Sequence, residues 1–145
     1  MKIVKKEKEK RSEAIMYYKL ANNTDFECFD RYFRNIKANE YDVMKPVMEH
    51  LKSVITILEE NYTEEKSAGG FVAFFCENID IENCYERQQI LQQYHLSDAD
   101  CEMRDFLCSY ENESGNIVNW YCDLYVLTDY HVVLIYSCVT ETLHK

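Results

Sequence analysis

The C-terminal third of the chain alternates apolar and polar side chains with a period of two, which is typical of β-strands. In the central segment, residues 117–127, one face would carry Val118, Trp120, Cys122, Leu124 and Val126, and the opposite face Asn119, Tyr121, Asp123 and Tyr125. Turn-forming residues at 112–116 and 128–130 separate this segment from an apolar-polar run on either side. The pattern therefore predicts a three-stranded antiparallel meander over about 103–111, 117–127 and 131–139.

The last predicted strand differs from the other two because residues 132–139 are nearly all apolar and mostly β-branched or aromatic. Such a run is typical of a strand that is covered on both faces or central in its sheet. A small sheet with one apolar face is not stable alone in water, so the preceding residues must cover it.

Upstream of residue 100 the apolar positions recur mainly at helical spacing. Phe26, Phe29 and Phe33 predict a helix over about 25–37, capped by Thr24, and a longer apolar stripe predicts a helix over about 43–61, capped by Asp42. A short apolar run predicts a strand at 71–76, and a weakly apolar, glutamine-rich segment predicts a helix over 81–95. Residues 5–20 are interpreted as a helix, although the pattern at 15–20 fits a strand equally well.

These elements place the chain in the α+β class, with N-terminal helices packed against the meander. Residues 1–11 form a basic segment and residues 12–145 a single α+β domain. The element order is similar to that of NTF2-like and cystatin-like proteins, in which a curved antiparallel sheet wraps around helices. This resemblance concerns element order alone, and it implies a cavity between the sheet and the helices.

Charge is distributed unevenly along the chain. Residues 1–11 contain six basic and two acidic side chains, so the net charge of this segment is +4. Since the net charge of the whole chain is −10, the net charge of the remaining residues is −14. A body with that charge repels phosphate groups, which argues against direct nucleic-acid binding and against docking on an anionic membrane. We expect a protein partner or self-association, a homodimer included.

The seven cysteines are an odd number, and the first residues lack the apolar stretch of an export signal. We therefore expect a cytoplasmic protein with reduced thiols, no disulfide and cysteines that serve as small core residues. The sequence contains neither C-x-x-C nor H-x-x-x-H, and its only glycine pair precedes a predicted strand. These patterns predict no metal site and no cofactor.

The sequence favours a protein without catalytic activity, and we assign no catalytic residue. A nucleophile pair of Cys122 and His131, oriented by Asp123 or Asp129, is conceivable only if the strand register brought them together. Strict alternation along the strands argues against that arrangement.

The strongest candidate for binding is the polar face of the middle strand together with the start of the last one. Its residues are Asn119, Tyr121, Asp123, Tyr125 and His131. Tyrosines mixed with an acid and an amide offer apolar area with polar tips, as interaction surfaces do. The same row would also serve as the wall of a cavity or as an ordinary half-exposed sheet face.

Three functions follow from these observations. The first is a binding or assembly module that uses the tyrosine-bearing face. The second is an NTF2-like pocket protein that binds a small ligand or performs simple acid–base chemistry. The third is an acidic inhibitor or immunity-type protein that occupies a basic or nucleic-acid-binding site, for which carboxylates at phosphate-like spacing on one face would be required.

Overall fold

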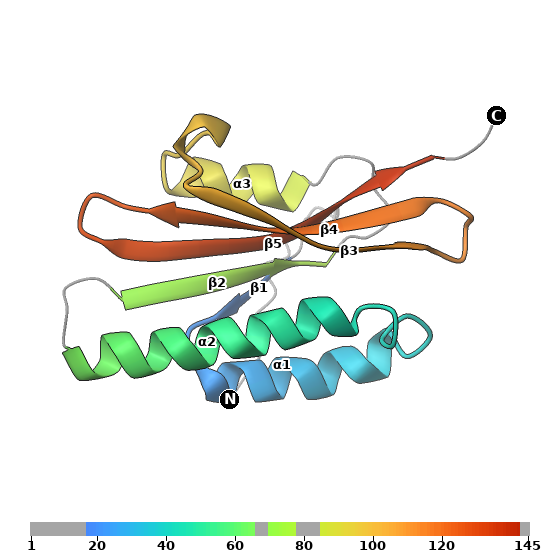
Figure 1. Ribbon diagram of the computed structural model, residues 1–145, viewed down its shortest axis with the longest axis horizontal. Coiled ribbons are helices and arrows are strands. Elements are labelled where there is room, and N and C mark those ends of the chain that lie inside the picture. Colours follow the sequence, from blue (N-terminus) through green and yellow to red (C-terminus); the bar gives the residue numbers. More distant parts are fainter. Residues whose placement is uncertain (1–16, 66–69, 78–84, 143–145) are drawn as a thin grey trace, which may run out of the picture.

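The computed structural model describes residues 17–65, 70–77 and 85–142, with backbone alone at 62–65. The residues in these ranges form an α+β fold with three α-helices and a five-stranded mixed sheet. The elements, in chain order, are β1 (Tyr17–Leu20), α1 (Asn23–Ile36), α2 (Lys45–Glu65), β2 (Gly70–Cys76), α3 (Tyr85–Gln93), the 3₁₀ turn η1 (Asp98–Asp100), β3 (Met103–Glu111), β4 (Ile117–Val126) and β5 (His131–Glu141). Helices α1 and α2 cover one face of the sheet and α3 lies on the other (Figure 1). We call these the α2 face and the α3 face.

The strand order is β1-β2-β5-β4-β3, so β5 is central and β3 lies at one edge. Strands β3, β4 and β5 pair antiparallel in succession, whereas β2 pairs parallel with β5. The predicted meander is therefore not a separate sheet but one side of a larger mixed sheet. Every residue of β5 from 132 to 138 is buried, which is the physical reason why nearly all of them are apolar.

The predicted N-terminal helix over 5–20 is wrong at its C-terminal end, where Tyr17–Leu20 form strand β1, while residues 5–16 lie outside the described part of the chain. Strand β1 pairs antiparallel with β2 and buries Tyr18 and Leu20 on the α2 face. The alternative interpretation of this segment as a strand was the correct one, because alternate residues are buried.

The other predicted helices differ from the observed ones at their ends. Helix α1 is capped by Asn22 and not by Thr24, since the Asn22 side chain accepts a 2.8 Å hydrogen bond from the Asp25 backbone N–H. Helix α2 begins at Lys45, and Pro46 occupies its first turn, where a missing N–H costs little. Within the described residues the 81–95 helix runs from Tyr85 to Gln93.

The larger core lies between the α2 face and the two long helices. Trp120 is fully buried there and stacks on Phe75 with ring centroids 5.1 Å apart. Its indole N–H donates a 2.9 Å hydrogen bond to the Tyr110 hydroxyl, so the one polar atom of this side chain is paired. The alternation along β4 thus hides Val118, Trp120 and Cys122, as the sequence predicts, whereas Val126 at the end of the same predicted face is exposed.

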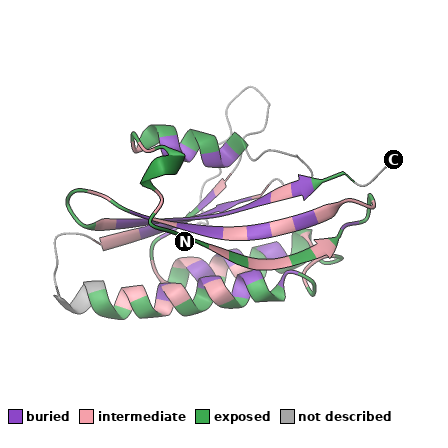
Figure 2. Ribbon diagram, turned by 45° about the horizontal axis from the view of Figure 1, so that its top comes forward, coloured by how far each residue is buried: buried purple, intermediate pink, exposed green. Residues whose placement is uncertain are grey.

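A second, smaller core lies beneath α3, where Ile90 and Leu91 pack on the α3 face near Phe74, Ile135 and Tyr125. Tyr125 is fully buried, although its sequence pattern predicts a half-exposed position. Burial along the sheet falls off toward β3, which carries exposed and intermediate residues (Figure 2). In the described part of the chain, no helix combines the length and the hydropathy needed to span a membrane.

Candidate functional site

Asp123 is a fully buried carboxylate in the middle of strand β4, on the α3 face. The strand register places it beside Arg104 of β3 and Ile135 of β5. Moving a carboxylate out of water is costly unless cations and hydrogen-bond donors replace the lost hydration. The surroundings of Asp123 therefore define the polar centre of this face.

Arg87 of α3 supplies the main compensation. Its Nε donates a 2.9 Å hydrogen bond to Asp123 Oδ2, while its terminal nitrogen reaches Asp98 Oδ1 at 2.5 Å and the Tyr125 hydroxyl at 3.2 Å. The Tyr125 hydroxyl in turn donates to Asp123 Oδ2 at 3.4 Å. One buried guanidinium thus connects α3, η1 and β4 through charge-assisted hydrogen bonds.

The ionisation of these groups follows from that geometry. Burial acts to lower the pKa of Arg87, but the hydrogen bond to Asp98 and the neighbouring acidic groups raise it overall. The hydrogen bond from Arg87 lowers the pKa of Asp98. Burial raises the pKa of Tyr125, so its hydroxyl remains a donor at neutral pH.

Arg104 lies on the other side of Asp123, toward the edge of the sheet. Its Nε is 3.5 Å from Asp123 Oδ1, an atom that accepts no hydrogen bond from the described residues. The Arg104 guanidinium also lies over the Tyr121 ring, 4.3 Å from its centroid, and its side chain is 42% exposed. A cation–π contact and an ion pair therefore hold Arg104 against the sheet while leaving it accessible.

Phe106 extends this exposed cluster along β3. Its side chain is 58% exposed, and its ring packs edge-on against Tyr121 with centroids 5.7 Å apart. We call Arg104, Phe106 and Tyr121 the Arg104 patch. Arginine and aromatic residues are enriched in the cores of protein interfaces and contribute much of their binding energy.

The structure separates the five candidate residues of the sequence analysis. Asp123 and Tyr125 belong to the buried network, and Tyr121 belongs to the exposed patch above it. Asn119 accepts a 2.9 Å hydrogen bond from Ser109 and lies further along the same two strands. His131 begins β5 opposite Gly70, whereas Asp123 pairs with Ile135, so the strands do not bring the imidazole to that carboxylate.

Sequence reasoning missed Arg87, Asp98, Arg104 and Phe106. A signal for Arg87 was present, because it precedes Ile90 and Leu91 by three and four residues and so shares the buried side of their helix. A charge on a buried helix face requires a partner, which points to an acid on the facing sheet. The sequence carries no comparable signal for Asp98, whose position depends on the loop after α3.

A second cluster of polar side chains lies on the α2 face, where His50 Nδ1 is 2.8 Å from the Tyr136 hydroxyl. Tyr136 also shares a hydrogen bond with Cys122, and Asp105 lies 3.8 Å from His50 Nε2. Burial raises the pKa of Cys122 to about 12, so this side chain is a thiol at neutral pH. Burial also lowers the pKa of His50, an effect that Asp105 opposes.

The structure therefore excludes a nucleophile pair of Cys122 and His131. Cys122 pairs with Tyr136 on the α2 face, five residues along β5 from His131, and its thiol is buried and protonated. The histidine that approaches Cys122 comes from α2 through the Tyr136 hydroxyl. This arrangement stabilises polar groups within a core and does not create a thiolate.

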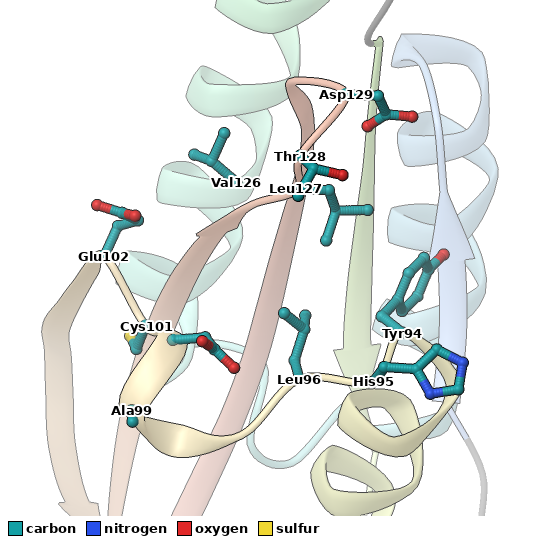
Figure 3. Close-up of a pocket in the computed structure, with 11 residues that line it drawn as sticks. Tyr94, His95, Leu96, Ala99, Cys101, Glu102, Val126, Leu127, Thr128 and Asp129 are labelled. Atoms are coloured by element: carbon teal, nitrogen blue, oxygen red, sulfur yellow. The ribbon is translucent and has the colours of Figure 1, made fainter.

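An open pocket of about 750 Å³ lies between the segment that follows α3 and the β4–β5 turn (Figure 3). Its lining comprises Tyr94, His95, Leu96, Ala99, Asp100, Cys101, Glu102, Val126, Leu127, Thr128 and Asp129. Leu96 and Leu127 point into the space between the two segments, while the Glu102 carboxylate and the His95 ring point away from it (Figure 3). Two leucines thus add apolar area to a lining that is otherwise largely polar, and none of the five residues predicted as a cavity wall lines this pocket.

The thiols and acids of the described residues do not form a metal centre. Among residues 17–65, 70–77 and 85–142, no group of three or more His, Cys, Asp or Glu side chains is arranged to hold a metal ion. The cysteines of the described residues are free thiols, in accordance with the expected absence of disulfides: Cys28, Cys76, Cys101, Cys108, Cys122 and Cys138.

Comparisons of this chain with protein-family models, curated protein sequences and solved structures gave no match.

Proposed function

We propose that this chain is a non-catalytic protein-binding module and that it contacts its partner through the Arg104 patch. The observation that carries this proposal is the exposure of Phe106 and Arg104 on the edge strand β3, next to Tyr121. A large aromatic ring at such a position gains free energy when a partner covers it, and the guanidinium supplies directional hydrogen bonds.

The patch is ordered before any partner arrives. Arg104 is held between the Tyr121 ring and the Asp123 carboxylate, and Phe106 packs against the same tyrosine. All three side chains project from paired strands and not from loops. Ordering these groups in advance reduces the entropy lost on binding, which favours affinity.

The buried network beneath the patch supports this interpretation over acid–base chemistry at the same face. Asp123, the one acid of the polar row predicted on this strand, is enclosed beneath α3 in an ion pair with Arg87. A carboxylate in that position anchors a helix and orients Arg104 and has no access to a substrate.

Site-specific photo-crosslinking tests the proposal. A photoreactive phenylalanine analogue replaces Phe106 in cells that produce the protein, and the same analogue replaces Ile57, which is 53% exposed on α2, as the matched control. We expect one defined protein adduct from position 106 and none from position 57. The adduct should disappear when Arg104→Ala is combined with the analogue. Equal adducts from both positions, or none from position 106, would contradict the proposal.

Small-ligand binding is a second candidate function, favoured by the open pocket beside the β4–β5 turn. The pocket offers two leucines, Leu96 and Leu127, for apolar contact and polar side chains for hydrogen bonds, the two kinds of contact that ligand sites combine. Screening small molecules by NMR against the protein and a Leu127→Trp variant, in which the larger indole side chain obstructs the pocket, would test this function. A ligand that binds the variant as tightly as the unmodified protein would exclude the site.

A further inference from the structure

We propose that the partner at the Arg104 patch is a second copy of this chain, joined by antiparallel pairing of β3 with β3. This inference rests on the proposed function and specifies its partner. Strand β3 is the longer of the two edge strands, and no strand of the described residues pairs with its outer edge. An unpaired edge of this length offers backbone donors and acceptors to another strand.

An irregularity inside β3 decides which residues can face each other in such a pair. The pairing of β3 with β4 shifts between Phe106 and Cys108, so Leu107 is an extra residue. Before the shift Arg104 and Phe106 lie on the α3 face, since they pair with Asp123 and Tyr121. After the shift the odd-numbered residues of β3 occupy that face instead.

The pairs with β4 give the faces after the shift. Ser109 pairs with Asn119, and Glu111 pairs with Ile117, so both lie on the α3 face. Leu107 and Cys108 both pack against the core of the α2 face. The bulge therefore divides β3 into two halves whose face patterns are offset by one residue.

A two-fold axis normal to the sheet relates two antiparallel copies of β3, so the α3 faces of both copies lie on the same side of the joined sheet. Directly opposed residues must therefore lie on the same face of each copy. Pairing that is centred between Leu107 and Cys108 meets this condition along the whole strand. It places Arg104 opposite the partner's Glu111, and Phe106 opposite the partner's Ser109.

Neighbouring registers do not meet the condition. A shift by one residue places Arg104 opposite the partner's Tyr110, which packs on the α2 face. A shift by two residues in one direction sets Glu111 opposite the partner's Glu102, a like-charge pair that is destabilising. A shift by two residues in the other direction shortens the ladder and opposes Cys108 to the partner's Ser109, which lie on different faces.

The favoured register combines charge complementarity with the burial of Phe106. Symmetry repeats the Arg104–Glu111 pair on both sides of the axis, and the exposed Phe106 ring of each copy is covered by the partner's strand. The net charge of −10 per chain opposes association, so the two ion pairs and the two aromatic rings must offset that repulsion.

Charge reversal tests the register directly. Sedimentation velocity of the full chain over about a hundredfold concentration range should show a monomer–dimer equilibrium governed by mass action. Arg104→Glu and Glu111→Arg should each give a monomer, because each variant opposes like charges. An equimolar mixture of the two variants should form a heterodimer, since both opposed pairs are then complementary. Arg31→Glu, on the exposed side of α1, is the control and should dimerise like the unmodified chain.

Several outcomes would overturn the inference. β3 pairing would be excluded if the unmodified chain were monomeric at every concentration. Pairing in this register would also be excluded if the two charge-reversal variants failed to associate when mixed although circular dichroism shows that each is folded. Should Arg104→Glu fail to fold, Glu111→Arg compared with Glu111→Gln still decides, because only the charge reversal should abolish the dimer. A monomeric chain whose position 106 crosslinks a different protein would refute self-pairing and leave the proposed function intact.

Discussion

Arg87 of α3 donates from Nε to Asp123 Oδ2 of β4 over 2.9 Å, and this buried contact fastens the short helix to the sheet. Helix α3 buries only Glu86, Arg87, Ile90 and Leu91, so its apolar contact with the sheet is small. The ion pair therefore supplies much of what positions α3. It also brings Asp98 of η1 to the same guanidinium, which fixes the start of the segment leading into β3.

Asp123→Asn should destabilise the protein by about 3 kcal/mol, because removing one charge of a buried pair leaves the other uncompensated. Urea unfolding followed by circular dichroism measures this change. Asp42→Asn is the matched control, since Asp42 is exposed, and it should change stability by less than about 0.5 kcal/mol. Equal effects of the two substitutions would show that the Arg87–Asp123 pair has no structural importance.

The double variant Arg87→Leu/Asp123→Leu distinguishes the contribution of the ion pair to stability from that of side-chain packing. Replacing both charged partners by apolar side chains removes the desolvation cost together with the attraction. We therefore expect the double variant to be more stable than the sum of the two single substitutions predicts. Strict additivity would mean that the two residues do not interact in solution.

Tyr110→Phe should destabilise the protein by about 1–3 kcal/mol, because the buried indole N–H of Trp120 loses its acceptor. Trp120 is the single tryptophan, so its fluorescence during urea unfolding measures the effect directly. Tyr130→Phe serves as the control, since Tyr130 is 71% exposed. Loss of this exposed hydroxyl should leave the free energy of unfolding unchanged. An unchanged midpoint for Tyr110→Phe would indicate that water replaces the hydroxyl.

Stability should fall as the pH decreases below about 6.5, the ordinary pKa of histidine, because of His50. Burial lowers the pKa of His50 in the folded state, so the unfolded chain binds a proton first and unfolding is favoured as the pH falls toward the lowered value. One such group contributes at most about 1.4 kcal/mol per pH unit. His50→Gln should remove this slope, whereas His95→Gln, at an exposed position, should retain it. The free energy of unfolding measured from pH 8 to pH 5 gives the comparison.

The cysteines of the described residues should react with a thiol reagent in two groups. Cys28, Cys101 and Cys108 are partly exposed and should be labelled in the native protein. Cys76, Cys122 and Cys138 are buried and should be labelled only after unfolding. Peptide mass spectrometry with two isotopic forms of the reagent, added before and after denaturation, distinguishes the groups. Rapid native labelling of Cys122 would contradict a buried thiol whose pKa is raised to about 12.

Local pattern was sufficient for the elements whose burial repeats with a fixed period. The alternation around Trp120 predicts β4, and the phenylalanines of α1 predict a helix, because one face of each element meets the core. The nearly all-apolar run of β5 predicts a position covered on both faces, and that strand is the central one. Segment 17–20 was ambiguous, since four residues are too few to distinguish a strand from a helical turn.

The amino-acid pattern alone was enough to predict the α+β class, the burial of Trp120 and the polar residues on the second face of β4. It did not predict that Asp123 and Tyr125 lie beneath α3 while Tyr121 remains accessible, because α3 covers part of that face and not all of it. The pairing of β2 with β5, the bulge at Leu107 and the approach of Arg87 to Asp123 join residues far apart in the chain. Their geometry depends on the packing of whole elements, which periodicity within one segment does not encode.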